Sequence, residues 1–376
     1  MRVLSVSALV DPVTGGGTAE RTLQLARAMS RGGMAVRVLG TDRGLRDAPR
    51  RIDVGHAELE LLPCRNERFL IPRHATQRIA QRVAEADVVH LCNHWTVLNL
   101  MVRRAALRLG KPYLVCPAGA LPLFGRSKWL KRAYNAFGGR ALVAQAAGWV
   151  AITRRETADF APYGVDPQRV EVIPNGIEPA DYAEGEASVF RERLALGTAR
   201  VVLFVGRLNA IKGPDLLLEA FISRASALDA AQLVFVGPDD GMRAALEQRA
   251  RAARLTERVR FAGWLGGADK LAAYRAADVV VVPSRQEAMS LVALEAGACA
   301  RPVLLTDRCG FDEAAASGGA RLVAADAQAI GAALGELLAH PQLAQMGERL
   351  RSLILSDYTW DAAVRRYAAL FERVTR

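Results

Sequence analysis

Residues 279–298 read VVVVPSRQEAMSLVALEAGA, and this stretch decides the fold of the chain. Its four leading valines predict a buried parallel strand, because such a strand is covered on both faces and is apolar throughout. Leu291, Leu294 and Ala298 then recur at the spacing of a helix. Ser290 is a typical N-cap, so the stretch predicts a strand, a loop and a helix whose N-terminus is a natural anion-binding site.

Two carboxylates bracket this expected helix N-terminus. Glu287 falls in the loop and Glu295 about two turns into the helix, and at ~1.5 Å per residue the eight steps between them span on the order of 12 Å. That is roughly the reach of a diphosphate with one sugar at each end, so one carboxylate could hold sugar hydroxyls and the other a ribose. The alternative is that Glu287 caps the helix and Glu295 is a solvated surface charge.

The composition is that of a globular protein. A length of 376 residues favours two domains, and 51% hydrophobic residues supply a large core. No window reaches the ~18 apolar residues of a membrane helix, and residues 1–7 read as a strand rather than a signal peptide. The five cysteines are scattered, odd in number and without a CxxC pair, which predicts reduced thiols in a cytoplasmic protein.

Strands and helices alternate along both halves of the chain, which is typical of parallel sheets with helices on both faces. We therefore predict an α/β fold with two doubly wound, Rossmann-like domains, whose ligands bind at the carboxyl ends of the strands. A small, acidic segment at about 179–189 predicts a linker, which gives a first domain at 1–178 and a second at 179–357. Strands are expected at 1–8, 36–39, 87–91, 113–116, 149–152 and 170–173, and at 201–205, 233–236, 259–261, 279–282, 303–305 and 321–323.

The net charge of +11 is confined to the first half of the chain. Residues 1–180 hold 26 Lys and Arg against 15 Asp and Glu, whereas residues 181–376 hold 24 of each. A basic half indicates an anionic partner. The alternative is an Arg-rich surface that only keeps the protein in solution.

A second loop with anion-binding chemistry follows the expected strand at 201–205. Gly206 allows close backbone approach, and Pro214 is placed to start the next helix. Between them, Arg207 offers a fork that matches phosphate, and Lys212 offers a point charge. Two cations that face a diphosphate stabilise the negative charge that builds on a departing nucleotide. If the loop stood alone, two ordinary surface bases would be the better interpretation.

The Gly-Arg-Leu-x-x-x-Lys-Gly loop at 206–213 and the Glu-x7-Glu pattern at 287–295 together resemble the retaining glycosyltransferases of the GT-B fold, specifically glycosyltransferase family 4. The Gly-Gly loop near the N-terminus, the Ile-Pro-Asn-Gly-Ile turn at 173–177 and the last, Trp-containing helix fit the same family. The resemblance implies two domains that face each other across a cleft. The first would bind the acceptor, the second would bind a nucleotide-sugar, and a helix at 358–376 would pack back on the first.

The resemblance also implies roles for individual residues. Arg207 and Lys212 would bind the donor diphosphate and stabilise the leaving group, and Glu287 would hold hydroxyls of the transferred sugar. Glu295 would bind the nucleotide ribose. The donor site would further include Gly16, Gly17, Gly206, Ala288, Met289, Ser290 and Leu291, and the acceptor side or cleft would include His90, His94, Ala118, Gly119 and Asn175.

Two stretches depart from the family pattern. Where the family often has Glu-Gly-x-Gly, residues 287–290 read Glu-Ala-Met-Ser, which keeps the backbone N–H donors but narrows the sugar pocket. Where many members have Pro-His-Gly, residues 117–119 read Pro-Ala-Gly, so the histidine that usually meets the donor sugar is missing. One hypothesis is that the donor sugar lacks a 6-hydroxyl.

His90 and His94 lie at the end of an expected strand and could suggest a metal site. Enzymes of the resembled family need no metal, so neither a metal nor another cofactor is expected. A histidine of the core or of the cleft lining is the favoured interpretation, on the acceptor side in the latter case.

Residues 121–137 combine bases with aromatic residues and contain no acid, within an expected helix that runs over 127–146. This combination is typical of contact with an anionic membrane surface or a lipid diphosphate. The alternative is a domain helix with a solvated basic face. The residues expected to contact the membrane are Arg126, Lys128, Trp129, Lys131 and Arg132.

The leading interpretation is a retaining, metal-independent hexosyltransferase. It would move a hexose or 6-deoxyhexose from a GDP- or UDP-linked donor to a glycan, linked to a polyprenyl diphosphate at the inner face of the cell membrane, in bacterial surface polysaccharide assembly. Alternatives are a nucleotide-sugar epimerase or phosphorylase of the same fold, or a basic membrane-binding protein without catalysis. Nucleic-acid binding and NAD chemistry are disfavoured, because no base-stacking platform is evident and residues 15–20 lack the GxGxxG spacing.

Overall fold

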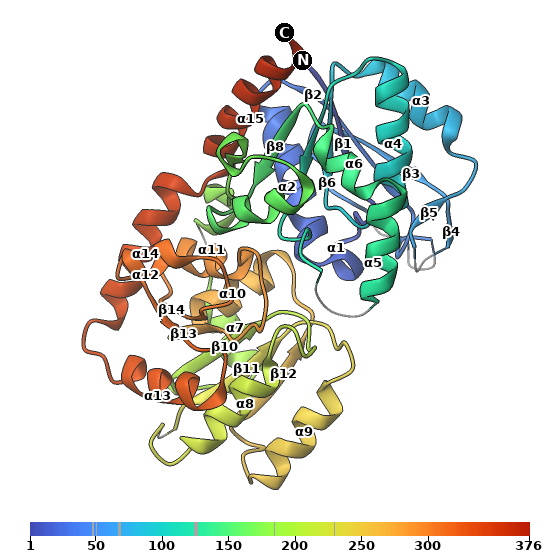
Figure 1. Cartoon of the computed structure of the whole chain (residues 1–376). Coiled ribbons are helices and arrows are strands. Elements are labelled where there is room, and N and C mark those ends of the chain that lie inside the picture. The colour runs from blue at the N-terminus through green and yellow to red at the C-terminus, as the bar shows by residue number, and fades with distance from the viewer. Residues whose placement is uncertain (47–48, 50, 67–68, 124–126, 184, 229) are drawn as a thin grey trace. The chain divides into compact units, whose positions relative to one another are not determined.

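The computed structural model describes residues 1–46, 49, 51–66, 69–123, 127–183, 185–228 and 230–376. Over these residues the chain divides into two compact units, whose elements are labelled in Figure 1. Unit 1 comprises Met1–Gly176 and Trp360–Arg376, and unit 2 comprises Ile177–Thr359.

Unit 1 is built on a parallel sheet with the strand order β3-β2-β1-β6-β7-β8-β9. The strands are β1 Arg2–Val6, β2 Ala35–Thr41, β3 Glu58–Leu62, β6 Val88–Cys92, β7 Tyr113–Cys116, β8 Gly148–Ala151 and β9 Glu171–Val172, and β4 Cys64–Asn66 pairs antiparallel with β5 Ile71–Pro72. The helices are α1 Pro12–Gly15, α2 Gly17–Arg31, α3 Thr76–Glu85, α4 Val97–Arg108, α5 Lys128–Tyr134, the π-helix η1 Asn135–Gly139, α6 Arg140–Ala144, the 3-10 helices η2 Arg155–Tyr163 and η3 Pro167–Arg169, and α15 Trp360–Thr375.

The central strands of unit 1 are buried on both faces, as their apolar sequences require. Every residue of β6, β7 and β8 is buried. The chain adds strands in opposite directions from β1, with β2 on one side and β6 on the other, so the order reverses between β1 and β6. In doubly wound sheets, ligands bind beyond the carboxyl ends of the strands at such a reversal.

The last helix, α15, belongs to unit 1 although its sequence follows unit 2. It packs against α2, where the Trp360 indole N–H donates to the Gln24 side-chain oxygen over 2.7 Å. Tyr367 and Phe371 on the same helix are fully buried, and α15 runs beside the unit-1 elements in Figure 1. Unit 1 is therefore completed by residues that lie more than 180 positions after its first segment ends.

Unit 2 has its own parallel sheet, with the strand order β12-β11-β10-β13-β14-β15 and a reversal between β10 and β13. The strands are β10 Val201–Val205, β11 Gln232–Val236, β12 Val259–Gly263, β13 Val279–Val282, β14 Val303–Thr306 and β15 Ala320–Val323. The helices are η4 Pro179–Tyr182, α7 Ala187–Arg193, α8 Pro214–Ser223, α9 Arg243–Ala252, α10 Gly267–Ala276, α11 Leu291–Ala298, α12 Asp312–Ala316, α13 Ala327–Leu338 and α14 Leu343–Asp357.

The prediction of two doubly wound parallel sheets is confirmed, but two local expectations are wrong and one edge strand was not predicted. The helix expected over 127–146 is broken into α5, η1 and α6, because Gly138 has a non-helical φ of 148°. The segment expected to be a linker contains η4 and the start of α7. The edge strand β3 was not anticipated, since its sequence ELELL carries two glutamates and resembles a surface segment more than a strand.

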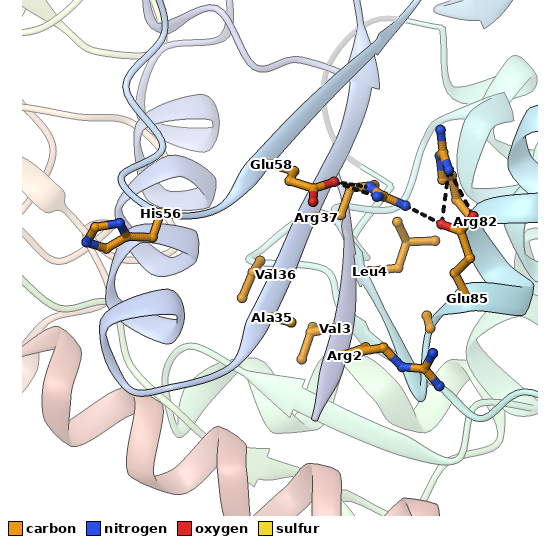
Figure 2. Close-up of a pocket in the computed structure, with 11 residues that line it drawn as sticks. Arg2, Val3, Leu4, Ala35, Val36, Arg37, His56, Glu58, Arg82 and Glu85 are labelled. Carbon is orange, nitrogen blue, oxygen red and sulfur yellow. Dashed lines mark hydrogen bonds and ion pairs between the residues drawn. The ribbon is translucent and has the colours of Figure 1, made fainter.

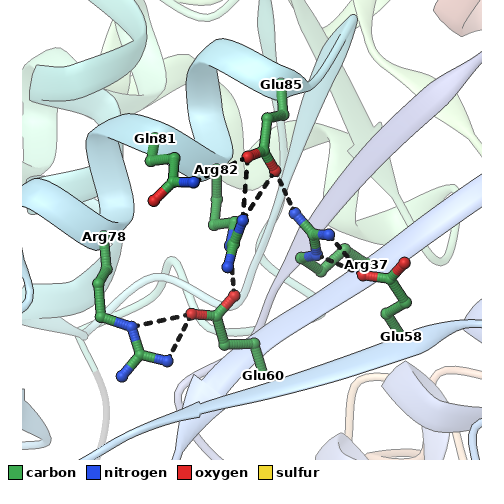
Figure 3. A network of polar contacts seen from close by, with 7 residues as sticks. All are labelled: Arg37, Glu58, Glu60, Arg78, Gln81, Arg82 and Glu85. Carbon is green, nitrogen blue, oxygen red and sulfur yellow. Dashed lines mark hydrogen bonds and ion pairs between the residues drawn. The ribbon is translucent and has the colours of Figure 1, made fainter.

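A chain of ion pairs ties β2, β3 and α3 together at one edge of the unit-1 sheet (Figure 3). Arg82 donates to Glu60 over 2.5 Å and to Glu85 over 3.0 Å, and Arg37 continues the chain to Glu85 and Glu58. Arg78 adds a second bond to Glu60, over 2.7 Å. The network explains why an edge strand with two glutamates is stable here.

A pocket of about 370 Å³ lies next to this network, at the amino ends of β1 and β2 (Figure 2). The arginines in its lining are each paired with a carboxylate: Arg2 with Asp87, Arg37 with Glu58, and Arg82 with Glu85. This end of the sheet is therefore electrostatically satisfied by its own side chains, and we assign the pocket a structural role.

The acidic member of the network with the least exposed side chain is Glu60, at 11%. Burial raises the pKa of its carboxyl, but the Arg82 and Arg78 guanidiniums outweigh burial and lower the pKa below the ordinary value of 4.5. Because the folded-state pKa lies below the unfolded value, the stabilising contribution is full above pH 4.5 and is lost as the pH falls.

We predict that Glu60→Gln lowers the free energy of unfolding at about pH 7 by on the order of 1 kcal/mol, and that less of the remaining stability is lost on acidification to about pH 3. Urea denaturation at both pH values measures the two effects. Glu58→Gln is the matched control, because its side chain is 68% exposed and a smaller effect is expected. Identical acid profiles for the wild type and Glu60→Gln would contradict the prediction.

Candidate active site

Two loops of unit 2 meet at the carboxyl ends of β10 and β13. The strands are hydrogen-bonded neighbours, with Val202 beside Val279 and Leu203 beside Val280. Gly213 makes the close approach of the loops possible. Its φ is +68°, and a Cβ built there would lie 2.1 Å from the Pro283 carbonyl oxygen.

Because the two loops lie close together, Lys212 and Glu287 form an ion pair. The Lys212 ammonium donates to one carboxylate oxygen over 2.8 Å, and the Ser284 hydroxyl donates to the other over 2.9 Å. The side chains are 28% and 12% exposed, so the pair is partly desolvated yet open to a ligand on one side. The structure thus brings together two residues that the sequence separates by 75 positions.

Arg207 lies on the same loop as Lys212 but has a different partner. Its guanidinium is 3.6 Å from the Asp240 carboxylate, and both side chains are about half exposed, at 44% and 50%. An exposed pair at this distance contributes little to stability, so the guanidinium is free to turn to a stronger anion. Gly206 opens this loop, and Asn209 fixes it by accepting the Lys212 backbone N–H over 3.0 Å.

Helix α11 begins directly after the second loop. The predicted N-cap is confirmed, since the Ser290 hydroxyl accepts the Ala293 N–H over 3.3 Å. Leu291 is the first helical residue, and Ala288 and Met289 precede the cap. The helix N-terminus therefore follows the strand at the order reversal, where its unpaired N–H groups and dipole favour an anion.

Glu295 is almost completely buried, at 5% exposure, and it has two partners on α10. Lys270 donates to one carboxylate oxygen over 2.8 Å, and the Tyr274 hydroxyl donates to the other over 2.5 Å. Burial and the neighbouring carboxylate raise the pKa of Tyr274 well above its ordinary value. The alternative of a solvated surface charge is therefore wrong for Glu295, and Lys270 and Tyr274 are partners of Glu295 that sequence reasoning missed.

In unit 1, the loop after β1 leads into α2. Asp11 caps α1 by accepting the N–H groups of Val13 and Thr14. Gly16, with a φ of 56°, is the N-cap of α2, and Gly17 is its first residue. The glycine loop thus ends in a helix N-terminus at the order reversal of the unit-1 sheet.

His90 and His94 are interior residues, so the structure favours a core histidine over a histidine of the cleft lining. Both side chains are completely buried. His90 packs edge-on against Tyr367 of α15, with ring centres 5.1 Å apart, and burial lowers its pKa to about 3. His94 is 3.0 Å from the Asn135 side-chain oxygen, and burial lowers its pKa to about 4. Both imidazoles are therefore neutral near pH 7 and serve packing.

Asn175 is also buried, at 3% exposure, and it is held by a buried arginine. Arg21 of α2 donates to the Asn175 side-chain oxygen over 2.7 Å, to the Cys116 sulfur over 3.0 Å and to the Tyr367 hydroxyl over 3.1 Å. Burial raises the pKa of the Cys116 thiol to about 11, so this partner is neutral. Arg21 thereby connects the turn at 173–177 with α2, β7 and α15.

The loop after β7 carries Ala118 and Gly119 in the left-handed region, with φ values of 51° and 81°. Such a φ costs a non-glycine residue roughly 1 kcal/mol or more, so the loop needs support. Glu156 supplies it. Its carboxylate accepts the Gly119 N–H over 2.5 Å and the Ile152 N–H over 2.7 Å. It therefore joins the loops that follow β7 and β8.

Of the basic segment, the structure describes Lys128, Trp129, Lys131 and Arg132 on α5, whereas Arg126 lies outside the described residues. Trp129 is 69% exposed. Lys131 is 5.0 Å from the ring centre of Trp95, which gives its ammonium an aromatic partner.

The fold of the chain is similar to that of several solved glycosyltransferases. The chain is similar to HepE of Anabaena, determined with UDP and glucose, with a TM-score of 0.81 and 18% identity over 99% of this chain and 100% of that one. It is also similar to sucrose-phosphate synthase of Thermosynechococcus elongatus, with a TM-score of 0.78 and 22% identity over 99% and 98% of the two chains. The protein therefore has the GT-B fold, as the sequence predicted.

Two protein-family models match the sequence, one in each half of the chain. The model "Glycosyl transferase 4-like domain" matches residues 16–176, and "Glycosyl transferases group 1" matches residues 199–340. A D-inositol 3-phosphate glycosyltransferase of Geodermatophilus obscurus is 35% identical over 246 residues, which are 62% of this chain and 55% of that protein. The chain thus spans about half the length of the curated relatives it matches. It belongs to the group 1 glycosyltransferases, glycosyltransferase family 4, and the predicted resemblance is confirmed.

Glu156 gives unit 1 a distinctive pH dependence. Burial raises the pKa of its carboxyl from 4.5 to about 7, although the Gly119 and Ile152 N–H groups and the Arg21 charge oppose the shift. Because the folded-state pKa is raised, its contribution to stability is full below pH 4.5 and is lost as the pH rises through about 7.

We predict that the free energy of unfolding of the wild type falls by roughly 3 kcal/mol relative to that of Glu156→Gln between about pH 4.5 and pH 8. Urea denaturation of both proteins across this range tests the difference, with Asp166→Asn on the surface as the control. A difference between wild type and Glu156→Gln that does not change with pH would contradict the raised pKa.

Proposed function

We propose that the protein is a retaining hexosyltransferase that uses a nucleoside-diphosphate sugar as its donor. The observation that carries the proposal is the Lys212–Glu287 pair beside the N-terminus of α11, at the order reversal of the unit-2 sheet. A donor diphosphate would replace Glu287 as the partner of Lys212, and its other charges would meet Arg207 and the α11 N–H groups. The carboxylate of Glu287 would then accept hydrogen bonds from the sugar hydroxyls.

The remaining donor contacts follow from the same placement. Glu295 would accept the ribose hydroxyls, sharing its oxygens with Lys270 and Tyr274, which hold the carboxylate in a fixed orientation. Gly16 and Gly17 would bring the N-terminus of α2 to the phosphates or the acceptor. A UDP- or GDP-linked donor is proposed, and UDP is supported by the similar HepE, which was also determined with UDP-glucose.

In the proposed reaction, the acceptor oxygen attacks C1 of the sugar on the same face from which the leaving diphosphate departs. The bond between the sugar C1 and the diphosphate oxygen breaks, and a bond from C1 to the acceptor oxygen forms. The acceptor proton passes to the departing diphosphate, whose growing negative charge Lys212 and Arg207 stabilise. Glu287 orients the sugar and is not a nucleophile in this scheme, so the protein's own cations supply the charge stabilisation.

We predict that Lys212→Ala weakens UDP or GDP binding by roughly 1.5–3 kcal/mol, which is about a 10- to 100-fold higher Kd, and lowers donor turnover at least as much. Isothermal titration calorimetry with each nucleotide measures the change. Arg249→Ala is the matched control, since Arg249 is an exposed cation of unit 2 paired with Glu219 on the helical surface. Wild-type nucleotide affinity in a folded Lys212→Ala protein would refute the assignment.

The acceptor is proposed to be an anionic glycan carrier, in keeping with the charge of the first half of the chain and with relatives named for D-inositol 3-phosphate. We propose a polyprenyl-diphosphate-linked glycan of bacterial surface polysaccharide assembly, reached from the cytoplasm. Ala118, where the family often has histidine, would leave room beside the donor sugar and suits a hexose or 6-deoxyhexose.

Peripheral membrane contact through α5 is part of this proposal. Within the described residues, no helix has the length and apolarity to cross a bilayer. Trp129 and Phe137 are 69% and 88% exposed, and Lys128 and Arg132 are exposed bases on the same segment. Exposed aromatic rings beside bases are the combination that binds an anionic bilayer interface.

We predict that Trp129→Ala lowers partitioning onto vesicles of phosphatidylglycerol and phosphatidylcholine several-fold, because the exposed indole would otherwise enter the interface. Co-sedimentation at low ionic strength measures the partition coefficient. Trp264→Ala in unit 2 is the control, since Trp264 is similarly exposed, at 54%, and should leave partitioning unchanged. Equal partitioning of Trp129→Ala and wild type would exclude α5 as the contact.

A further inference from the structure

A second pocket of unit 1 is unlike the one at the amino ends of its strands. It has a volume of about 620 Å³ and lies between residues 121–123, the α5–η1–α6 segment and η2. This volume is in the range of small-molecule sites in proteins.

The polar groups of the pocket wall are satisfied by one another. The Tyr163 hydroxyl donates to the Leu121 carbonyl over 3.0 Å, and the Asn135 side-chain N–H donates to the Tyr163 hydroxyl over 3.1 Å. The Asn135 oxygen is in turn 3.0 Å from the His94 ring nitrogen. These bonds are made within the wall, so the groups have little capacity left for a ligand, and Leu121, Pro122 and the other aliphatic lining atoms give the pocket an apolar character.

The charges of the lining favour an anion. Arg132 and Arg140 both line the pocket, and neither has a carboxylate within ion-pair distance among the residues that the structure describes. Asp159 is the acidic residue of the described lining, and burial raises the pKa of its carboxyl, against the opposing effect of Arg155. Even with Asp159 ionised, the described lining keeps a net positive charge. In the pocket at the amino ends of the strands, by contrast, every arginine of the described lining is paired, and Figure 2 shows the pairs of Arg37 and Arg82.

Two exposed apolar side chains belong to the segments that line the pocket. Phe137 follows the lining residue Ala136 on η1 and is 88% exposed, and Leu123 at the rim is 40% exposed. A ligand that matches this surface has an anionic head for the two guanidiniums and an apolar body for the wall and rim. Phosphate oxygens match the forked guanidinium, and a diphosphate carries enough of them to pair with both arginines.

We propose that this pocket binds the diphosphate and first isoprene units of a polyprenyl-diphosphate-linked acceptor. The inference rests on the proposed transferase function, for which it assigns the acceptor's lipid carrier to unit 1. The occupant is the acceptor carrier and not a bilayer phospholipid, because a pocket of about 620 Å³ accepts a single chain, whereas a flat interface needs only the exposed rings.

Binding of farnesyl diphosphate to the full chain tests the proposal, with inorganic pyrophosphate, farnesol and D-inositol 3-phosphate as comparison probes. We expect farnesyl diphosphate to bind at least tenfold more tightly than each of the other three, measured by calorimetry below its micelle concentration. The double variant Arg132→Gln, Arg140→Gln should weaken farnesyl diphosphate binding tenfold or more, while Arg104→Gln on α4 should not.

A matched pair of substitutions on η2 tests the cavity itself. Ala158 lines the pocket, whereas Ala161 is exposed on the same helix and is not in its lining. Ala158→Trp should abolish farnesyl diphosphate binding, and Ala161→Trp should leave it unchanged. Circular dichroism melting of both variants shows whether each is folded.

Three results would overturn the proposal: equal affinity of Ala158→Trp and wild type for farnesyl diphosphate, equal affinity for pyrophosphate and farnesyl diphosphate, or tighter binding of D-inositol 3-phosphate. If the wild type does not bind farnesyl diphosphate, and the double variant Arg132→Gln, Arg140→Gln loses vesicle partitioning, the surface binds bulk lipid. That result would equally overturn the proposal. Nucleotide binding is measured separately through Lys212→Ala in unit 2. Failure of the pocket is thereby distinguished from failure of the transferase assignment.

Discussion

The ion pair between Lys212 and Glu287, which are 75 positions apart in the sequence, depends on one constraint, the pairing of β10 with β13. That pairing puts the order reversal of the unit-2 sheet between two loops, each with a charged residue of the site. Gly213 then decides how closely the loops approach, since any side chain there would collide with the Pro283 carbonyl. The N-terminus of α11 enters the same place because its strand is β13. Sheet topology, one glycine and one helix cap together define the candidate donor site.

Most of this site is predictable from the sequence because its signals are local. The valine run, Ser290 and the Arg207–Lys212 loop each identify an element without knowledge of the fold. The partners of the site residues are not predictable in this way. Glu156, Arg21, Lys270 and Tyr274 look like ordinary helical residues, and only the tertiary structure shows that they are buried and which group each one holds. Edge strand β3 was not predicted for a related reason. Its glutamates are stabilised by arginines of α3 and β2, and these contacts are visible only in the tertiary structure.

In unit 1, several residues that were expected on the acceptor side or in the cleft make buried hydrogen bonds that hold loops in place. Asn175 is bound by Arg21, and His94 is bound to Asn135, each in the interior. Buried polar groups of this kind are costly unless they are paired, so they fix the loop positions more strictly than apolar packing does. Glu156 is the clearest case, because a carboxylate that accepts two backbone N–H groups sets the distance between two loops. The left-handed φ of Ala118 in the loop after β7 is thereby maintained.

The two anion sites inferred here differ in how a ligand gains its binding energy. At the proposed donor site, Lys212 already has Glu287 as its partner, so a diphosphate would exchange one ion pair for another and release the carboxylate to bind the sugar. Binding at this site would be coupled to the exchange of the Lys212 partner. That exchange is favourable only for a ligand with both phosphate and hydroxyl groups. In the apolar pocket, Arg132 and Arg140 have no carboxylate to give up among the described residues, and the wall polar groups are mutually bonded. Affinity there follows from charge neutralisation and apolar burial together, which suits a carrier held through successive steps better than a donor that must leave after one.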